Sequence, residues 1–365
     1  MPLSRSRARR CRSTAVGWRN SPDMARPEPL TVKTINLALQ GGGAHGAYTW
    51  GVLDALLADE RIAIEGISAT SAGAMNAAAL AQGMMMGGRE GARVALDRFW
   101  QAISAQSSPL MRVVQMTGRL FGGRADANPA FFALESMTRL FSPYELNPFD
   151  INPLRDVLSE LIDFDMLRRC TAVRLFVSAT NVRSGKIRVF ETHEMSAAVL
   201  LASACLPQFF RAVEIEGEAY WDGGYMGNPA IFPLIYHCRS PDVIVVHINP
   251  IRRDDVPTTA SAIMDRVNEV SFNSSLMREM RAIAFVTKLI DSGAVRDKSL
   301  KRVNMHSIES DDVMRKLGLS SKYDTDAGFL GELRAAGSAS ARNWLVAHYD
   351  GIGRESTVDI RAKYL

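Results

Sequence analysis

The first part of the chain alternates between short apolar runs and stretches with helical periodicity. Residues 34–40 and 62–68 are apolar runs with the length of strands, and apolar side chains recur at helical spacing over residues 45–60. An alanine-rich stretch follows from residue 72, as expected for a helix that packs closely on a sheet. Strand, helix, strand and helix in this order predict a βαβα unit and hence an α/β protein with a parallel sheet.

Similar patterns continue towards the C-terminus, after an irregular apolar interval at residues 107–152. Helical periodicity predicts further helices at residues 93–104, 153–163, 196–205 and 228–238. Apolar runs bounded by turn residues predict strands at residues 174–181, 186–191, 213–221, 243–248 and 303–308. From residue 258 the rest of the chain is mostly helical. We expect an α/β domain over residues 31–250 and a mostly helical extension, packed on it, over residues 251–365.

The charge is unevenly distributed along the chain. The formal net charge is +4, but residues 1–30 alone contribute +5 through seven Arg against two acids, so the remainder carries −1. A nearly neutral remainder argues against a nucleic-acid-binding face. Because residues 1–30 are rich in Arg, Ser and Pro, we expect a disordered basic tail there, with a transit peptide or an over-long start assignment as alternatives.

Cysteine usage and hydropathy indicate a cytoplasmic protein. The four cysteines show no metal-type spacing, and three of them lie in or beside apolar runs, so we expect reduced thiols: Cys11, Cys170, Cys205 and Cys238. No run reaches the roughly 18 apolar residues of a membrane span. The best candidate, residues 72–88, is interrupted by polar residues and glycines. Peripheral contact with a membrane surface stays open.

Ser71 lies in the turn between the second predicted strand and the alanine-rich helix. A sharp strand-to-helix turn can expose a serine hydroxyl for attack, provided that the residues two before and two after it are small. Ala69 and Gly73 meet this need. In a purely structural alternative, Ser71 only caps the helix, because serine is a favoured N-cap residue.

A glycine-rich turn follows the first predicted strand: Gly41, Gly42, Gly43, Ala44, His45 and Gly46. Residues without a Cβ atom let backbone N–H groups at a helix start approach a developing oxyanion closely. The same spacing is also a dinucleotide-binding fingerprint, which requires an acidic residue at the end of the second strand. That strand ends at residues 69–71 and Glu65 lies too early, so an oxyanion hole is favoured.

A third motif, Asp222-Gly223-Gly224, follows a predicted strand. On its own, an Asp-Gly pair predicts a hairpin turn. A serine nucleophile, however, needs a base that removes its proton. Together with the two earlier motifs, this requirement makes Asp222 the candidate base.

These three motifs, in this order, resemble those of the patatin-like phospholipase family, which has a glycine-rich oxyanion loop, a G-x-S-x-G serine turn and a later Asp-Gly-Gly/Ala aspartate. Residues 202–207 also look like the family's segment before the aspartate strand, and the resemblance spans about residues 35–248. It implies a three-layer α/β/α fold with a mostly parallel central sheet and a helical C-terminal extension. Two residues depart from the pattern: Ala69 replaces a glycine, and His45 stands where the family often has Arg or Lys.

The resemblance further implies a Ser71–Asp222 dyad that needs no metal and no other cofactor. The implied activity is hydrolysis of carboxylic esters in lipids, phospholipids or lysophospholipids above all, through an acyl-enzyme on Ser71. A rival triad would add His247, which follows Ser71 and Asp222 in the order of α/β-hydrolases, although a buried structural histidine is favoured. Two other functions stay open. One is binding of lipid or of a protein partner with only weak catalysis, and the other is binding of a dinucleotide.

Two regions bear on the substrate and on partners. The apolar residues of 107–152 suit an acyl-chain pocket, although ordinary core packing is favoured. A C-terminal stretch is amphipathic, with apolar positions opposite basic ones: Leu276, Met280, Ile283 and Ile290 against Arg278, Arg281 and Lys288. We expect it to pack on the α/β core rather than to dock on a membrane. The oligomeric state stays open.

Overall fold

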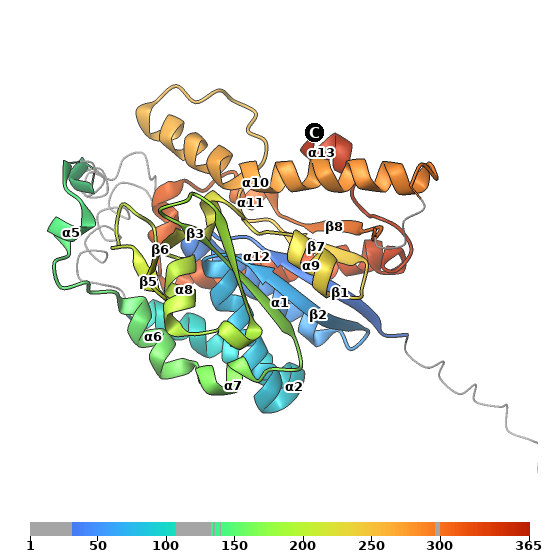
Figure 1. The fold of residues 1–365 in the computed structure, drawn as a ribbon, viewed down its shortest axis with the longest axis horizontal. Helices are drawn as coiled ribbons and strands as arrows, with labels where there is room; N and C mark the ends of the chain where they lie inside the picture. The colour runs from blue at the N-terminus through green and yellow to red at the C-terminus, as the bar shows by residue number, and fades with distance from the viewer. Residues whose placement is uncertain (1–30, 107–132, 134–135, 139, 296–299) are drawn as a thin grey trace, which may run out of the picture. The chain divides into compact units, whose positions relative to one another are not determined.

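The βαβα unit expected from the N-terminal pattern is present in the structure, a computed structural model (Figure 1). β1 (Lys33–Leu39) leads through η1 (Gly43–His45) into α1 (Gly46–Ala58), and β2 (Ile62–Ala69) leads into α2 (Ala72–Ala105). The structure describes residues 31–365 apart from 107–132, 134–135, 139 and 296–299. The predicted basic tail, Cys11 and most of the apolar interval at 107–152 therefore lie outside the described residues.

In the described part of the chain, the strands form an eight-stranded, mostly parallel sheet in the order β5-β6-β3-β2-β1-β7-β8, with β4 also paired to β3. The parallel strands beside β1 and β2 are β3 (Arg174–Asn181), β7 (Asp242–Val246) and β8 (Asn304–Ile308). The antiparallel strands are β4 (Ile187–Glu191), β5 (Val213–Ile215) and β6 (Glu218–Asp222). All predicted strands are present, although the expected single strand over 213–221 is a hairpin. Its turn is at Glu216 and Gly217, which have φ angles of 53° and 79°.

Helices cover both faces of the sheet. One face carries α1, α2 and α6 (Pro153–Leu161), together with α7 (Phe164–Arg168), α8 (Ala197–Ser203) and α12 (Ala327–His348). The other carries α9 (Phe232–His237), α10 (Ala260–Asp291) and α13 (Ile360–Tyr364). The remaining short segments are α5 (Pro143–Leu146), α11 (Asp311–Met314), η3 (Thr192–Glu194), η4 (Gly223–Tyr225), η5 (Leu319–Tyr323) and η6 (Tyr349–Gly351). No helix in the described ranges combines the length and apolarity needed to cross a bilayer.

Side chains of β7 alternate between two hydrophobic cores, as successive residues of a strand do. Ile244 and Val246 belong to the core with α1, α2 and α12, whereas Val243 and Val245 belong to the core with α9, α10 and α13. The predicted three-layer α/β/α fold with C-terminal helices is thereby confirmed.

The helices predicted at 72–88 and 93–104 are both present and together make up α2, with a kink between them at Gly87 and Gly88, which have non-helical backbone angles. One predicted helix differs from the observed one for a local reason. The helix predicted over 228–238 begins only at Phe232, with Pro233 in its first turn, where the missing proline N–H costs nothing.

The register of the central strands places the two glycine-bearing turns next to each other. Leu39 at the end of β1 pairs with Ala69 at the end of β2, and the two strands are parallel. Because both chains continue from the same edge of the sheet, the segments that begin at Gly41 and Ser71 emerge side by side.

Candidate active site

The turn at Ser71 has a backbone conformation that is uncommon for a residue other than glycine. Ser71 has φ 53° and ψ −124°, and it directly precedes α2. A Cβ atom on Gly73 would lie 2.5 Å from the carbonyl oxygen of Leu39, so helix and strand approach each other more closely than any side chain at this position allows. The N–H of Ser71 donates to Ser203 Oγ at 2.9 Å. Strand end, helix start and α8 thus hold the turn together.

The side chain of Ser71 does not cap the helix, although the residue occupies the N-cap position. Its side chain instead lies close enough to the carboxylate of Asp222 to lower the pKa of that carboxylate. The capping alternative therefore does not describe the geometry, because the Ser71 side chain makes no hydrogen bond to the N–H groups of α2.

Asp222 is fixed at the end of β6 by its backbone and its side chain. Its N–H donates to the carbonyl of Cys205 and its carbonyl accepts from Thr180 Oγ1, both at 2.8 Å. Its carboxylate oxygen Oδ1 accepts the N–H of Gly224 at 2.7 Å. Only 1% of the residue is exposed. The carboxylate therefore has one fixed orientation, towards Ser71.

Burial raises the pKa of Asp222 from 3.8 to about 7, although the hydrogen bond from Gly224, the neighbouring Ser71 side chain and the positive charge of Lys322 act in the opposite direction. A carboxylate with a pKa near neutrality is a better proton acceptor than an ordinary exposed aspartate. The site thus places a hydroxyl beside a basic carboxylate.

Both glycines after Asp222 are required by close packing. A Cβ atom on Gly223 would overlap the carbonyl oxygen of Ser178, and one on Gly224 would overlap the ring of Phe272. The Asp-Gly pair begins η4 and is not a hairpin turn. The hairpin alternative for this motif is therefore wrong.

The glycine-rich loop is in contact with Ser71. A Cβ atom on Gly41 would lie 2.7 Å from Ser71 Cβ, which only glycine permits. The N–H of Gly41 is already engaged, because it donates to Asn228 Oδ1 at 2.6 Å. Among the residues that the structure describes, none accepts a hydrogen bond from the N–H groups of Gly42, Gly43 or Ala44. These three groups remain available to an anion.

Buried amide side chains, which the sequence analysis did not identify, hold this loop. Asn249 Nδ2 donates to the carbonyl of Gly41 at 2.8 Å, and Gln40 Oε1 accepts the N–H groups of Ile248 and Asn249 at 3.0 Å each. Gln40 Nε2 in turn donates to Asn273 Oδ1 at 3.1 Å. The one signal in the sequence was Gln40, a polar residue directly between an apolar strand and the glycines.

The two alternative chemistries have no geometric basis in the described residues. His247 Nε2 lies 2.7 Å from the hydroxyl of Tyr364, and no histidine in the described part of the chain hydrogen-bonds with Ser71 or Asp222. Burial and the charge of Lys363 lower the pKa of His247. Glu65 accepts the N–H groups of Arg239 and Ser240 at 2.8 Å each, far from the end of its strand. Within the described ranges, no three side chains form a metal-binding cluster.

Residues 37–235 match the family described as patatin-like phospholipase. The chain belongs to this family. Membership implies a lipid acyl hydrolase. No curated protein matches the chain.

Two solved structures are also similar to the chain. VipD from Legionella pneumophila is 16% identical, with a TM-score of 0.39 over 86% of this chain and 67% of that one. The ExoU–SpcU heterodimer from the type III secretion system of Pseudomonas aeruginosa gives 16% identity and a TM-score of 0.28, over 92% of this chain and 75% of that one.

The departure from the patatin-like pattern at His45 brings no positive charge to the site. His45 is buried, and its Nε2 lies 2.8 Å from Ser321 Oγ. Burial and the nearby charge of Lys322 lower the pKa of His45 to about 3, so that the imidazole is neutral at physiological pH.

A cation reaches the site from a distant part of the chain. The backbone of Lys322, in η5, packs against Gly43, which has a φ of 58°. Lys322 Nζ donates to Asn249 Oδ1 at 3.0 Å and to Asn268 Oδ1 at 2.9 Å. Burial lowers the pKa of Lys322 to about 8, which leaves the ammonium mostly charged at pH 7. Lys322 therefore supplies, beside the glycine loop, the charge that His45 lacks.

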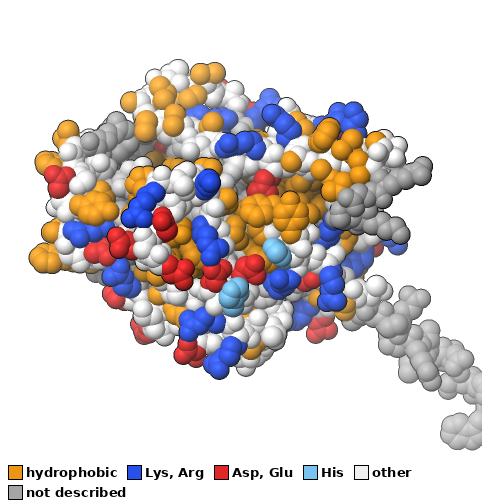
Figure 2. All heavy atoms as spheres, viewed as in Figure 1, with side chains coloured by type: hydrophobic (Ala, Val, Ile, Leu, Met, Phe, Trp, Pro, Cys, Tyr) orange, Lys and Arg blue, Asp and Glu red, His pale blue; other side chains and the backbone are white. Residues whose placement is uncertain are grey.

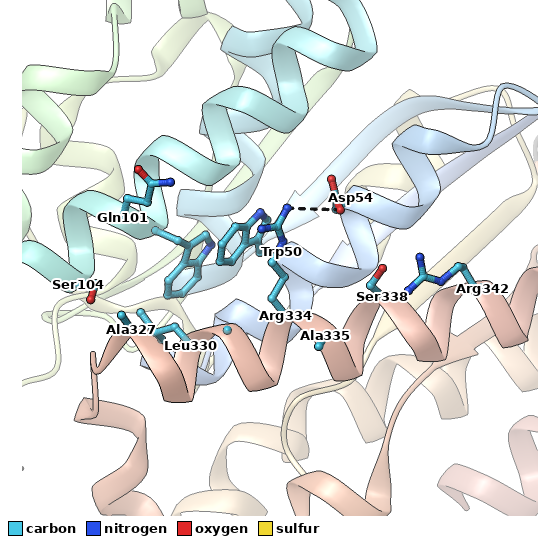
Figure 3. Close-up of a pocket in the computed structure, with 12 residues that line it drawn as sticks. Trp50, Asp54, Gln101, Ser104, Ala327, Leu330, Arg334, Ala335, Ser338 and Arg342 are labelled. Carbon is cyan, nitrogen blue, oxygen red and sulfur yellow. Dashed lines mark ion pairs between the residues drawn. The ribbon is translucent and has the colours of Figure 1, made fainter.

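A pocket of about 390 Å³ in the described residues lies away from the dyad, between α1, α2 and α12 (Figure 3). Its floor is formed by Trp50 and Trp100, whose rings stack with centroids 6.3 Å apart. Arg334 covers the Trp50 ring at 4.2 Å and pairs with Asp54 at 3.5 Å. Neither Ser71 nor Asp222 lines this pocket, so it is not part of the candidate active site.

Proposed function

We propose that this protein is a serine hydrolase that cleaves carboxylic esters of lipids, with Ser71 as nucleophile and Asp222 as general base. The observation that carries the proposal is the placement of the Ser71 side chain beside the buried carboxylate of Asp222, whose pKa it lowers. Family membership supports a lipid ester as the substrate, and phospholipids or lysophospholipids are the favoured class.

In the acylation step, Ser71 Oγ attacks the ester carbonyl carbon while Asp222 takes up the hydroxyl proton. The carbonyl oxygen becomes an oxyanion in the tetrahedral intermediate. The ester C–O bond then breaks, and the leaving alcohol takes the proton from Asp222. The acyl group is now bound to Ser71 as an ester.

In the deacylation step, Asp222 removes a proton from a water molecule that attacks the acyl carbon. The bond between this carbon and Ser71 Oγ breaks, and the proton returns to Ser71. A carboxylic acid is released and the dyad is restored. One carboxylate can serve both steps because a pKa of about 7 lets it take up and return a proton near neutral pH.

We assign the stabilisation of the oxyanion to the N–H groups of Gly42 and Gly43, with Ala44 beside them. They have no acceptor among the described residues and lie on a loop that touches Ser71. Gly41, also expected to donate, instead uses its N–H to bind Asn228 and contributes by its close approach to Ser71. Removal of one such donor typically costs about 10²–10³-fold in turnover.

Labelling with a fluorophosphonate, followed by mass spectrometry, tests the proposal. We expect a single adduct on Ser71, no adduct in Ser71→Ala, and much slower labelling in Asp222→Asn. Hydrolysis of phosphatidylcholine and of lysophosphatidylcholine by the same preparations then identifies the preferred ester. Absence of an adduct on a folded protein would contradict the proposal and favour a lipid-binding protein without turnover.

A further inference from the structure

The long helix α10 buries one side in the protein and exposes the other. Leu276, Met280 and Ile283 lie in the core between α10 and the sheet, with exposed fractions of 0%, 0% and 7%. The predicted packing of this amphipathic stretch against the α/β core is therefore confirmed. The opposite side of α10 is exposed and differs from the buried side in its residue types.

Helical spacing aligns the exposed side chains of α10 along a single outer face. Its first half is apolar and carries Ile263, Val267 and Val270, which are 44%, 55% and 52% exposed. Its second half carries the exposed cations Arg278, Arg281 and Lys288, with Phe285 among them at 62% exposure. Figure 2 shows orange and blue side chains along the upper edge of the molecule, where Figure 1 places α10.

The acidic side chains of α10 are turned away from this face and have partners elsewhere. Glu269 is buried and pairs with Arg253 and Arg266. Glu279 accepts the N–H groups of Ile231 and Phe232 at 2.8 and 2.9 Å.

Asp265 accepts the N–H of Leu319 at 3.2 Å, and Asp291, on another side of the helix, pairs with Arg302 at 2.8 Å. The outer face of α10 therefore combines apolar and positively charged groups without a negative one.

Within the described residues, the cations of this face have no acidic partner. In the described part of the chain, neither Arg281 nor Lys288 forms an ion pair, and Arg278 hydrogen-bonds only with Ser274 on its own helix. A row of unpaired cations beside exposed aliphatic side chains is complementary to a surface that is negatively charged outside and apolar beneath.

The same helix contacts the candidate active site on its inner side. Asn268 accepts a hydrogen bond from Lys322, whose backbone packs against Gly43. Phe272 contacts Gly224, two residues after Asp222. The half of α10 that exposes apolar side chains therefore lies, on its inner side, next to residues that contact the glycine loop and the turn after Asp222.

We propose that the outer face of α10 docks the protein on a lipid bilayer that carries anionic headgroups. Val267, Val270 and Ile263 enter the boundary between headgroups and acyl chains, and Arg278, Arg281 and Lys288 contact the anionic headgroups. The purpose of this surface rests on the proposed function. A hydrolase of lipid esters has to take its substrate from a bilayer, and the surface holds the dyad near that bilayer.

Vesicle sedimentation tests this surface without turnover. The full chain with Ser71→Ala is mixed with vesicles of phosphatidylcholine, with or without phosphatidylserine, and we expect substantial binding only to vesicles that contain phosphatidylserine. The double variant Arg278→Gln/Arg281→Gln should lower the partition coefficient by on the order of tenfold or more, since each basic residue near an anionic surface strengthens binding several-fold. Val267→Ser/Val270→Ser should lower it to a similar extent.

Matched variants on other helices serve as controls. Arg98→Gln/Arg342→Gln removes two exposed cations from α2 and α12, and Val346→Ser changes a side chain on α12 that is 90% exposed. These controls should bind as the parent does. Equal binding by the α10 variants and the controls, or equal binding to vesicles with and without phosphatidylserine, would overturn the proposal. Binding of this face to an acidic protein, without binding to vesicles, would overturn the proposal as well.

A second measurement separates this proposal from the proposed function. With Ser71 intact, the α10 variants should hydrolyse a soluble short-chain ester as the wild type does, but should lose hydrolysis of anionic vesicles. If the soluble ester is not cleaved while vesicle binding depends on α10, the hydrolase fails and the docking surface stands. If the ester is cleaved and the α10 variants act on vesicles as the wild type does, the docking surface fails and the hydrolase stands.

Discussion

The two glycine-bearing turns at the carboxyl edge of the sheet are held in different ways. The serine turn depends mainly on its immediate surroundings, with a positive φ at Ser71 and a close approach of Gly73 to the end of β1. The glycine loop depends on hydrogen bonds from Asn228 and Asn249, which are 187 and 208 residues away along the chain. The serine turn is therefore held mainly by close backbone packing together with one long-range hydrogen bond to Ser203, and the glycine loop is held by long-range side-chain hydrogen bonds.

The difference matters because the two turns tolerate different changes. A turn fixed by close backbone packing fails when a side chain is added, since backbone atoms cannot move aside. A loop fixed by distant amides fails when one amide is removed, because a buried N–H loses its partner. Asp222 lies beside Ser71 of the first turn, and Lys322 packs against the second. Variants at these positions separate the two kinds of support.

The largest effect on activity is expected where the base is removed. Asp222→Asn should lower kcat by about 10³-fold or more, because the amide cannot accept the proton of Ser71. The fold should survive, since the amide oxygen can still accept the N–H of Gly224. Turnover of a soluble ester and circular dichroism measure the two outcomes.

The same variant makes a prediction for stability. Folding raises the pKa of Asp222 from 3.8 to about 7. The contribution of this group to stability is therefore fully present below pH 3.8 and is lost as the pH rises through about 7. Asp222→Asn should therefore raise Tm at pH 8 and have little effect at pH 4. An equal shift at both pH values would contradict a buried, ionisable carboxylate.

A large loss of stability is expected in the serine turn. Gly73→Val should destabilise the protein by about 2–4 kcal/mol, because its Cβ meets the carbonyl oxygens of Leu39 and Gln40. Gly87→Val, with open space around the corresponding Cβ, is the matched control and should cost at most about 1 kcal/mol. Urea unfolding gives both values, and equal costs would disprove local packing as the support of this turn.

A smaller loss, seen in catalysis more than in folding, is expected in the glycine loop. Asn228→Ala leaves the N–H of Gly41 unpaired and should lower kcat by about tenfold to a hundredfold with a smaller change in KM. Its cost in stability should be about 1–3 kcal/mol. Asn343→Ala, at an exposed asparagine of α12, is the control. An unchanged kcat would mean that the loop holds its position without Asn228.

The smallest effect is a shift of a pH profile. The charge of Lys322 lowers the pKa of Asp222, so Lys322→Met should raise that pKa and move the acidic limb of kcat/KM, near pH 7, to higher pH. Activity should fall more at pH 6 than at pH 9. Lys316→Met, at an exposed position, should leave the profile in place. A uniform loss at all pH values would assign Lys322 a structural role only.

Much of the fold could be predicted from periodicity, and each miss has a specific physical cause. The turn of the β5–β6 hairpin was missed because Glu216 adopts a positive φ, for which the sequence shows only the following Gly217. The start of α9 was placed too early because the backbone and side chain of Asn228 are used by Ser275 and Gly41. In the candidate site, the positions of Ser71, Asp222 and the glycines were anticipated, whereas Asn228, Asn249 and Lys322 were not.

The sequence by itself determined the parts of this protein that depend on neighbours along the chain. The β1-α1-β2-α2 unit, the small residues around Ser71 and the glycines next to Asp222 all leave a signal within a few positions, because periodicity and steric demands act locally. Only the tertiary structure decided which groups face the dyad. Lys322, and not His45, brings the positive charge, and Asn228 occupies the N–H of Gly41. Such contacts join residues far apart in sequence, whose side chains meet only after the sheet has formed.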